Sequence, residues 1–183
     1  MNHQPTIVDR LMEDFSLLQK EIDVKSPSLK VTAVDVFGKT LLLAAASYFE
    51  KKITSILVDE VERRSPSDVL IIEFFKNKAL SRNYHTFFAW ESKNANAFFA
   101  LFGDGFKDYM KDCCNNDEDL RTSIRAFLEL GNDRNRLVHQ NFGEFVMEKN
   151  VEEVYDLYCK AIRFVERIPV CMKNFVAEQE KGA

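Results

Sequence analysis

The sequence predicts an all-α fold, a helical bundle of four or five main helices with short helices inserted between them. Apolar residues recur at three- and four-residue intervals through most of the chain, the spacing that places them on one face of a helix. Pro27 and Pro66 separate the periodic stretches, as expected where helices end and begin. With 183 residues, 46% of them hydrophobic, the chain can bury one core, so residues 1–183 are interpreted as a single domain.

The first three helices are predicted in residues 5–24, 29–64 and 67–80. Pro5 suits the first turn of the first helix. The second helix ends in basic residues, which interact favourably with the negative, C-terminal end of the helix dipole. Gly38 is a point at which that second helix can bend without stopping. The apolar face of the first helix consists of Ile7, Leu11, Phe15, Leu18 and Ile22.

Residues 81–114 form the least regular segment, because Asn, Gly and Ser divide its short apolar runs. Short helices and loops are predicted there. The phenylalanines of this segment are interpreted as packing over the core rather than as an aromatic platform for nucleic acid.

The last two helices are predicted in residues 117–140 and from residue 150 onward. Asp117 begins the first of them, with further acids at the positive end of its dipole, and Gly131-Asn132 is a position where it can kink. Asn150 and Glu153 have the spacing of a capping box. Pro169 is expected to kink or end the last helix, and the loop before it, residues 141–150, can hold a short extended piece at "GEFVM".

Composition limits the classes of function. The net charge is −4 and the sequence pI is about 5.5, so any contact with nucleic acid is expected to be local rather than driven by a global basic field. The four cysteines form no CxxC pair, which argues against a structural metal and for a reducing compartment. We predict neither a signal peptide nor a membrane-spanning segment, and therefore a cytoplasmic protein. No cofactor is predicted.

The stretch "LGNDRNRLVHQNF" places Arg134, Asn135 and His139 at the end of the helix predicted in residues 117–140. On a helix Asn135 lies beneath His139, while Arg134 points about 140° away from His139. One chain therefore aims Arg134 and His139 apart. They can converge if two copies of this helix meet, so the pattern raises the hypothesis of a homodimer.

The chemistry that suits such a pair is the cleavage of RNA by its own 2′-hydroxyl. A histidine can accept or donate that proton near neutral pH, and an arginine can stabilise the charge of the phosphate transition state, with no metal required. Asn135 can orient the histidine or hold a phosphate oxygen. The spacing alone is weak evidence, since the same residues also fit a charged rim on a structural helix.

The motif "RNRLVH", with "AASYFEKKIT" before it and "EEVYDLYCKAIRFVERI" after it, resembles the RiboL-PSP branch of the HEPN superfamily. The resemblance covers most of the chain as a single HEPN-like domain. It implies a metal-independent endoribonuclease that acts as a homodimer, a toxin or phage-defence effector, with Arg134, Asn135 and His139 as catalytic residues. RNA and an antitoxin or defence-system protein are the partners it implies, and no membrane is among them.

The sequence departs from one pattern of the superfamily. HEPN toxins controlled by a nucleotidyltransferase antitoxin commonly carry a tyrosine two residues after the histidine, where this chain has Asn141, so regulation by adenylylation there is not predicted. Two alternatives stay open, a non-catalytic HEPN interaction module and a nucleotide-binding regulator.

Further basic residues are candidates for RNA contact, with a surface or structural role as the alternative. Arg136 lies inside the motif, and "SRNYHTF" supplies Arg82 and His85, a local echo of the same chemistry. Glu50, beside two lysines, is interpreted as part of a helix surface. No metal-ligating residues are predicted.

Overall fold

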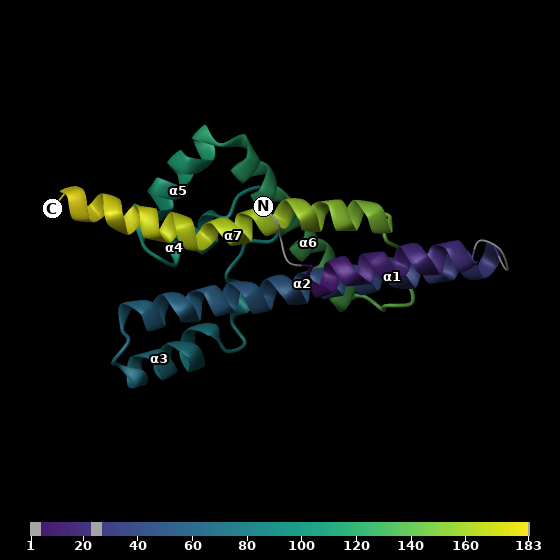
Figure 1. The fold of residues 1–183 in the computed structure, drawn as a ribbon, viewed down its shortest axis with the longest axis horizontal. Helices are drawn as coiled ribbons and strands as arrows, with labels where there is room; N and C mark the ends of the chain where they lie inside the picture. Colours follow the sequence, from purple (N-terminus) through teal and green to yellow (C-terminus); the bar gives the residue numbers. More distant parts are fainter. Residues whose placement is uncertain (1–4, 23–26, 183) are drawn as a thin grey trace.

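The computed structural model describes residues 5–22 and 27–182, and every regular element in these ranges is helical (Figure 1). The prediction of an all-α bundle is confirmed. The α-helices are α1 (Ile7–Ile22), α2 (Pro27–Arg64), α3 (Val69–Phe75), α4 (Asn96–Ala100), α5 (Asp104–Asn116), α6 (Glu118–His139) and α7 (Val151–Gly182). The stretch Lys76–Leu80 is a π-helix and Tyr84–Thr86 a 3₁₀-helix.

The core lies where α2, α6 and α7 meet. Figure 1 shows α2 and α7 running along the length of the molecule, with α1 against α2 and α6 packed on α7. Phe49 of α2 lies between Phe127 of α6 and Tyr158 of α7, with ring centroids 5.5 and 5.4 Å apart. All three rings are buried. Burying an aromatic side chain contributes about 1.5–3 kcal/mol, so this junction holds the three long helices together.

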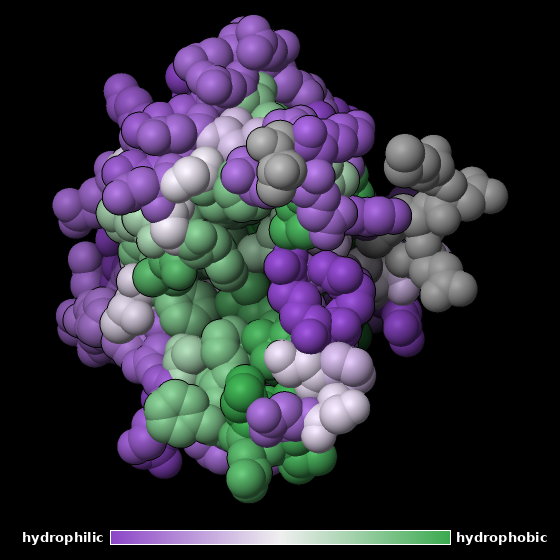
Figure 2. All heavy atoms as spheres, turned by 90° about the vertical axis from the view of Figure 1, so that its left-hand side faces the viewer, coloured by the Kyte–Doolittle hydropathy of each residue, from purple (hydrophilic) through white to green (hydrophobic). Residues whose placement is uncertain are grey.

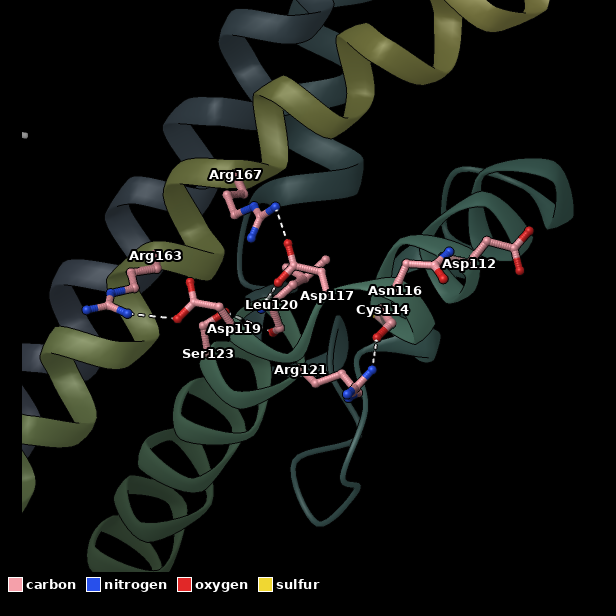
Figure 3. A network of polar contacts seen from close by, with 10 residues as sticks. All are labelled: Asp112, Cys114, Asn116, Asp117, Asp119, Leu120, Arg121, Ser123, Arg163 and Arg167. Carbon is pink, nitrogen blue, oxygen red and sulfur yellow. Dashed lines mark hydrogen bonds and ion pairs between the residues drawn. The ribbon is translucent and has the colours of Figure 1, made fainter.

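The start of α6 is fixed by charged contacts with α7 (Figure 3). The Asp117 carboxylate caps the helix by accepting the Leu120 N–H at 2.9 Å, and it also accepts from Arg167 of α7. One turn along α7, Arg163 donates to Asp119 at 2.8 Å. The prediction that Asp117 begins this helix is confirmed. Asp117 is the N-cap and Asp119 lies in the first turn, so both acids also interact favourably with the positive end of the helix dipole.

Three predicted interruptions resolve in different ways. Gly38 does not stop α2, and a β-carbon there would meet only ordinary contacts. Gly131 does not break α6, which is continuous to His139. Pro169 lies inside α7 without ending it.

The capping box predicted at the start of the last helix is confirmed, since the Asn150 side chain accepts from Glu153 N–H and the Glu153 side chain accepts from Asn150 N–H, each at 2.8 Å.

The third predicted helix changes its character at Lys76, where the α-helical part ends and the π-helix begins. The segment after it has the short helices that its broken apolar pattern predicts. At "GEFVM" the structure has turn and irregular backbone rather than a strand.

One end of the molecule is apolar. Figure 2 shows hydrophobic residues gathered there, at the end where Figure 1 places α3. Leu70 is 83% exposed and Phe74 is 68% exposed. Beside them runs a groove lined by Leu57, Val61, Phe75, Phe102, Phe106 and Met172, among others. No helix in residues 5–22 and 27–182 is long and apolar enough to cross a membrane.

Candidate functional site

The last two turns of α6 carry the residues that the motif singles out. Arg134 and Asn135 are half-buried, while Arg136 and His139 are exposed. His139 is the last residue of the helix, and Gln140 after it has extended backbone. The side chains of Arg134 and His139 therefore leave α6 in different surroundings, as the helical spacing predicts.

Arg134 lines a small, partly open cavity, here called the Arg134 cavity. It holds about 20 Å³ of space, enough for about one water molecule. Its walls come from α2, α6 and the segment around the 3₁₀-helix, and they include Phe49, Glu50, Tyr84, His85, Trp90 and Asn135. The Arg134 Nη1 atom donates to the Asn135 Oδ1 atom at 3.2 Å. Among the described residues no carboxylate pairs with Arg134, so its charge is available to a ligand.

The hydroxyl of Tyr84 is a neutral polar group in the lining of this cavity. Burial raises the pKa of its hydroxyl far above the usual range, the Glu50 carboxylate raises it further, and the Arg134 guanidinium lowers it. Tyr84 is therefore protonated at every physiological pH. Glu50, Tyr84 and Arg134 therefore bring a carboxylate, a neutral phenol and a guanidinium to the lining of one cavity.

His139 lines a different space, an open groove at the end of α6, here called the His139 groove. Its volume is about 610 Å³, within the range of sites for small ligands. Asn135 and Trp90 line both the groove and the Arg134 cavity, whereas Arg134 does not line the groove. The groove is lined by Ala89, Trp90, Glu91, Asn132, Asn135, Arg136, His139 and Gln140.

Trp90 forms the wall between the two spaces because it lies directly on α6. A β-carbon at Gly131 would be 2.0 Å from the Trp90 Cζ3 atom, so only glycine leaves room for the indole. The indole Nε1 donates to the His85 carbonyl at 2.9 Å. Its ring centroid lies 5.0 Å from Phe88 and 5.7 Å from Phe127. These contacts fix the segment around His85 against the helix that carries Arg134.

The loop after His139 is held by a buried lysine of α2. The Lys39 side chain is 2% exposed, and its ammonium donates to the Phe142 carbonyl at 2.9 Å. Asp35, one turn earlier on α2, balances its charge at 2.8 Å. The path of the chain leaving the His139 groove is thus set by α2 as well as by α6.

The three residues predicted to contact RNA lie in different surroundings. His85 is brought together with Arg134 and Asn135, because it lines the Arg134 cavity. Arg82 is exposed, has a φ of 62° and lines neither space. Arg136 lines the groove, but it pairs with Glu148 at 2.8 Å and with Asp133 at 3.7 Å, so its charge is already balanced in this chain.

Sequence reasoning did not identify Trp90, Tyr84 and Glu91 as parts of the site, and it interpreted Glu50 as helix surface. Glu50 is exposed, yet it also lines the Arg134 cavity. The one feature of the sequence that pointed to Trp90 was Gly131. A glycine inside a helix can mark a bend, as predicted above, or leave room for a side chain such as the Trp90 indole. Among the described residues no group of three or more His, Cys, Asp or Glu side chains is placed to hold a metal ion.

Comparison with known families gives one match. The family model described as RiboL-PSP-HEPN matches residues 9–174, which include α2 and α6 entirely and most of α1 and α7. Neither a curated protein nor a solved structure matches the chain significantly.

Proposed function

Because the chain belongs to the RiboL-PSP-HEPN family, we propose that it is a metal-independent endoribonuclease whose site is built by two copies of the chain. HEPN domains are associated with nuclease or RNA-related roles, and the finer assignment depends on the residues at the end of α6. Arg134, Asn135 and His139 are the catalytic set.

The observation that carries the proposal is the availability of these side chains. Arg134 lines a cavity with no pairing carboxylate among the described residues, and His139 is exposed at an adjoining groove. Asn135 borders both spaces and accepts from Arg134. A guanidinium that forms no ion pair among the described residues can bind a phosphate, and a solvent-accessible imidazole beside it can move a proton.

In the reaction, the His139 imidazole takes the proton of a ribose 2′-hydroxyl while the 2′-oxygen attacks the adjacent phosphorus. The bond from phosphorus to the 5′-oxygen breaks, that oxygen takes a proton from water, and the His139 imidazolium then releases to solvent the proton that it accepted. The products are a 2′,3′-cyclic phosphate and a 5′-hydroxyl. Arg134 stabilises the negative charge that accumulates on the phosphate oxygens in the transition state. Single-stranded or loop RNA is the substrate, because the 2′-hydroxyl must swing in line with the leaving oxygen, which a duplex resists.

Two copies of the chain are needed because one copy points Arg134 and His139 into different spaces. The surface around His139 supports such a pairing, since Val138 is 45% exposed, Phe142 is 43% exposed and Val146 is 77% exposed in the isolated chain. Apolar residues gathered on a surface favour association with another protein surface. Around the catalytic set, Arg136, Arg82 and His85 are proposed to contact RNA.

The test is RNA cleavage in EDTA by the purified protein. Wild type should release fragments that end in a 2′,3′-cyclic phosphate, and His139→Ala should cleave about two to four orders of magnitude more slowly. Arg63→Ala on the exposed face of α2 is the matched control and should keep wild-type activity. Cleavage that appears only after a divalent metal is added would contradict the mechanism.

The competing function is a non-catalytic interaction module of the same family. Arg134 held by a buried carboxylate would favour it, and no such carboxylate is present among the described residues. If the protein has that function, RNA incubated with the purified dimer should stay intact. Arg134→Ala should then weaken the association of the two chains, with no cleavage activity to lose.

A further inference from the structure

The outward face of α6 carries polar residues well beyond the catalytic set. Counting back from His139 at 100° per residue, Asn132, Arg125 and Arg121 all lie within about 40° of the His139 direction. Arg125 is about 21 Å and Arg121 about 27 Å from His139 along the helix axis. Leu128, which lies on the same side between Asn132 and Arg125, is buried. The polar residues on this side therefore form two groups, one at the groove and one near the first turns of α6.

A second cavity, here called the basic cavity, is lined by the group near the first turns of α6. It has a volume of about 300 Å³. Its lining includes Lys93, Lys111, Arg121 and Arg125, with the amide side chains of Asn94 and Asn115, and no acidic residue. In a chain with a net charge of −4, four cations without a carboxylate in one lining form a local positive site.

The basic cavity and the His139 groove share no lining residue, but both use α6 and the segment of residues 89–96. Both are bounded on one side by α6. On the other side the groove uses residues 89–91, and the basic cavity uses residues 93–96 of the same segment. A linear ligand that lies in the groove and follows the edge of α6 toward its first turn therefore reaches the basic cavity next.

Among the residues that the structure describes, two of the four cations have no ion-pair partner. Arg121 donates to the Cys114 and Asn115 carbonyls and pairs with Glu118, and Figure 3 shows it reaching Cys114 at the end of α5. Lys111 pairs with Asp108 at 2.7 Å. Lys93 and Arg125 are exposed and pair with no carboxylate in the part of the chain that the structure describes. These two residues are the ones that a bound anion would neutralise.

We propose that the basic cavity binds the phosphodiester backbone of single-stranded RNA several nucleotides away from the phosphate at His139, with Lys93 and Arg125 as its main contacts. The inference rests on the proposed ribonuclease function. The 21 Å from His139 to Arg125 equals roughly six stacked nucleotides at about 3.4 Å each, or fewer in an extended strand. Contacts to phosphate carry no sequence information, but they position the strand. The site therefore selects RNA by length and single-stranded form.

The substrate length provides the sharpest test. The double variant Lys93→Gln/Arg125→Gln should lower kcat/KM about ten- to hundred-fold on a 12-nucleotide single strand, which can span both sites. A trinucleotide is too short to do so, and the loss on the 12-mer should exceed the loss on the trinucleotide at least tenfold. Lys52→Gln/Lys173→Gln removes the same charge from exposed positions on α2 and α7 and should cleave both substrates as wild type does. Equal losses on both substrates, or the same loss in the control pair, would overturn the proposal.

A binding measurement separates this inference from the ribonuclease function. In a His139→Ala background, fluorescence anisotropy with the 12-mer should give a salt slope that the Lys93/Arg125 variant reduces by about 1.4, the value for two phosphate contacts to a single strand. If wild type cuts no RNA but this slope still changes, the ribonuclease function fails and the binding site stands. If wild type cuts RNA and the slope is unchanged, the binding site fails alone. A polyglutamate peptide that displaces the 12-mer at equal charge concentration would assign the cavity to an acidic protein segment instead.

Discussion

The indole of Trp90 lies on the backbone of α6 at Gly131, where an added β-carbon would be 2.0 Å from the ring atom Cζ3. Trp90 is the only tryptophan of the chain, and it lines both the Arg134 cavity and the His139 groove. One glycine therefore determines how closely the segment around His85 approaches the helix that carries Arg134, Asn135 and His139.

Gly131→Ala should destabilise the protein by about 1–3 kcal/mol, because the indole must move from a packed position. Gly38→Ala is the matched control, since Gly38 is also a buried glycine inside a helix, and its β-carbon would meet Met147 and Val151 only at 3.6 and 3.7 Å. That change should be neutral or stabilising by up to about 1 kcal/mol. Urea unfolding measures both, and a shift in Trp90 fluorescence in Gly131→Ala alone locates the effect. Equal stability of the two variants would contradict the close approach.

The acid dependence of stability should involve Asp117. The Leu120 N–H and then the Arg167 guanidinium hold the pKa of this carboxyl below its usual range. A carboxyl with a lowered folded-state pKa stabilises the fold fully above its unfolded pKa of about 3.9, and that stabilisation is lost as the pH falls through the folded-state pKa. Asp117→Asn keeps a capping side chain but cannot titrate.

The measurement compares urea midpoints at pH 7 and pH 3. Wild type should lose more stability over this interval than Asp117→Asn does. Arg167→Gln should reduce the same difference, because it removes one of the groups that lower the pKa of Asp117. An acid-induced loss in Asp117→Asn as large as in wild type would show that other carboxyls are responsible.

The long helices could be predicted from sequence because the information for them is local. The cap at Asp117, the reciprocal pair Asn150 and Glu153 and the spacing of apolar residues all act within a few positions of the chain. The divergence of Arg134 and His139 follows from helical geometry in the same way.

The walls of the site could not be predicted because they depend on contacts between distant segments. Trp90 meets Gly131 across 41 positions of sequence, and its room on α6 is visible only when both are in place. A glycine in a helical pattern indicates either a bend or a close approach, and at Gly131 the structure shows the close approach of Trp90 within a continuous helix. The switch to a π-helix at Lys76 likewise has no signal in the apolar pattern.

Lys39 should be required for the structure of the loop after His139. Lys39→Met removes the donor to the Phe142 carbonyl and leaves Asp35 to solvent, so stability should fall by about 1–3 kcal/mol. Hydrogen exchange should become faster in residues 141–149 before it does so in the core. Lys52→Met, an exposed lysine on the same helix, serves as the control with no expected change. Faster exchange spread evenly over α2, α6 and α7 would show general destabilisation instead of a local role.

The final prediction concerns the origin of the catalytic set. Arg134→Ala and His139→Ala should each lower cleavage by roughly two to four orders of magnitude. Neither should melt α6, since Arg134 is half-buried and His139 is exposed at the last position of the helix. Both variants should therefore remain folded, and both should still sediment as dimers.

Mixing the two variants then decides whether one site draws on both chains. If a scissile phosphate needs Arg134 of one chain and His139 of the other, co-refolded heterodimers contain one intact site and one site that lacks both residues. Part of the activity should return, in proportion to the heterodimer measured by native mass spectrometry. No recovery despite confirmed heterodimers would mean that each site takes both residues from one chain or needs all four. The shared site is proposed because a single α6 points Arg134 and His139 about 140° apart. An active monomer would refute it outright, since one chain would then suffice for cleavage.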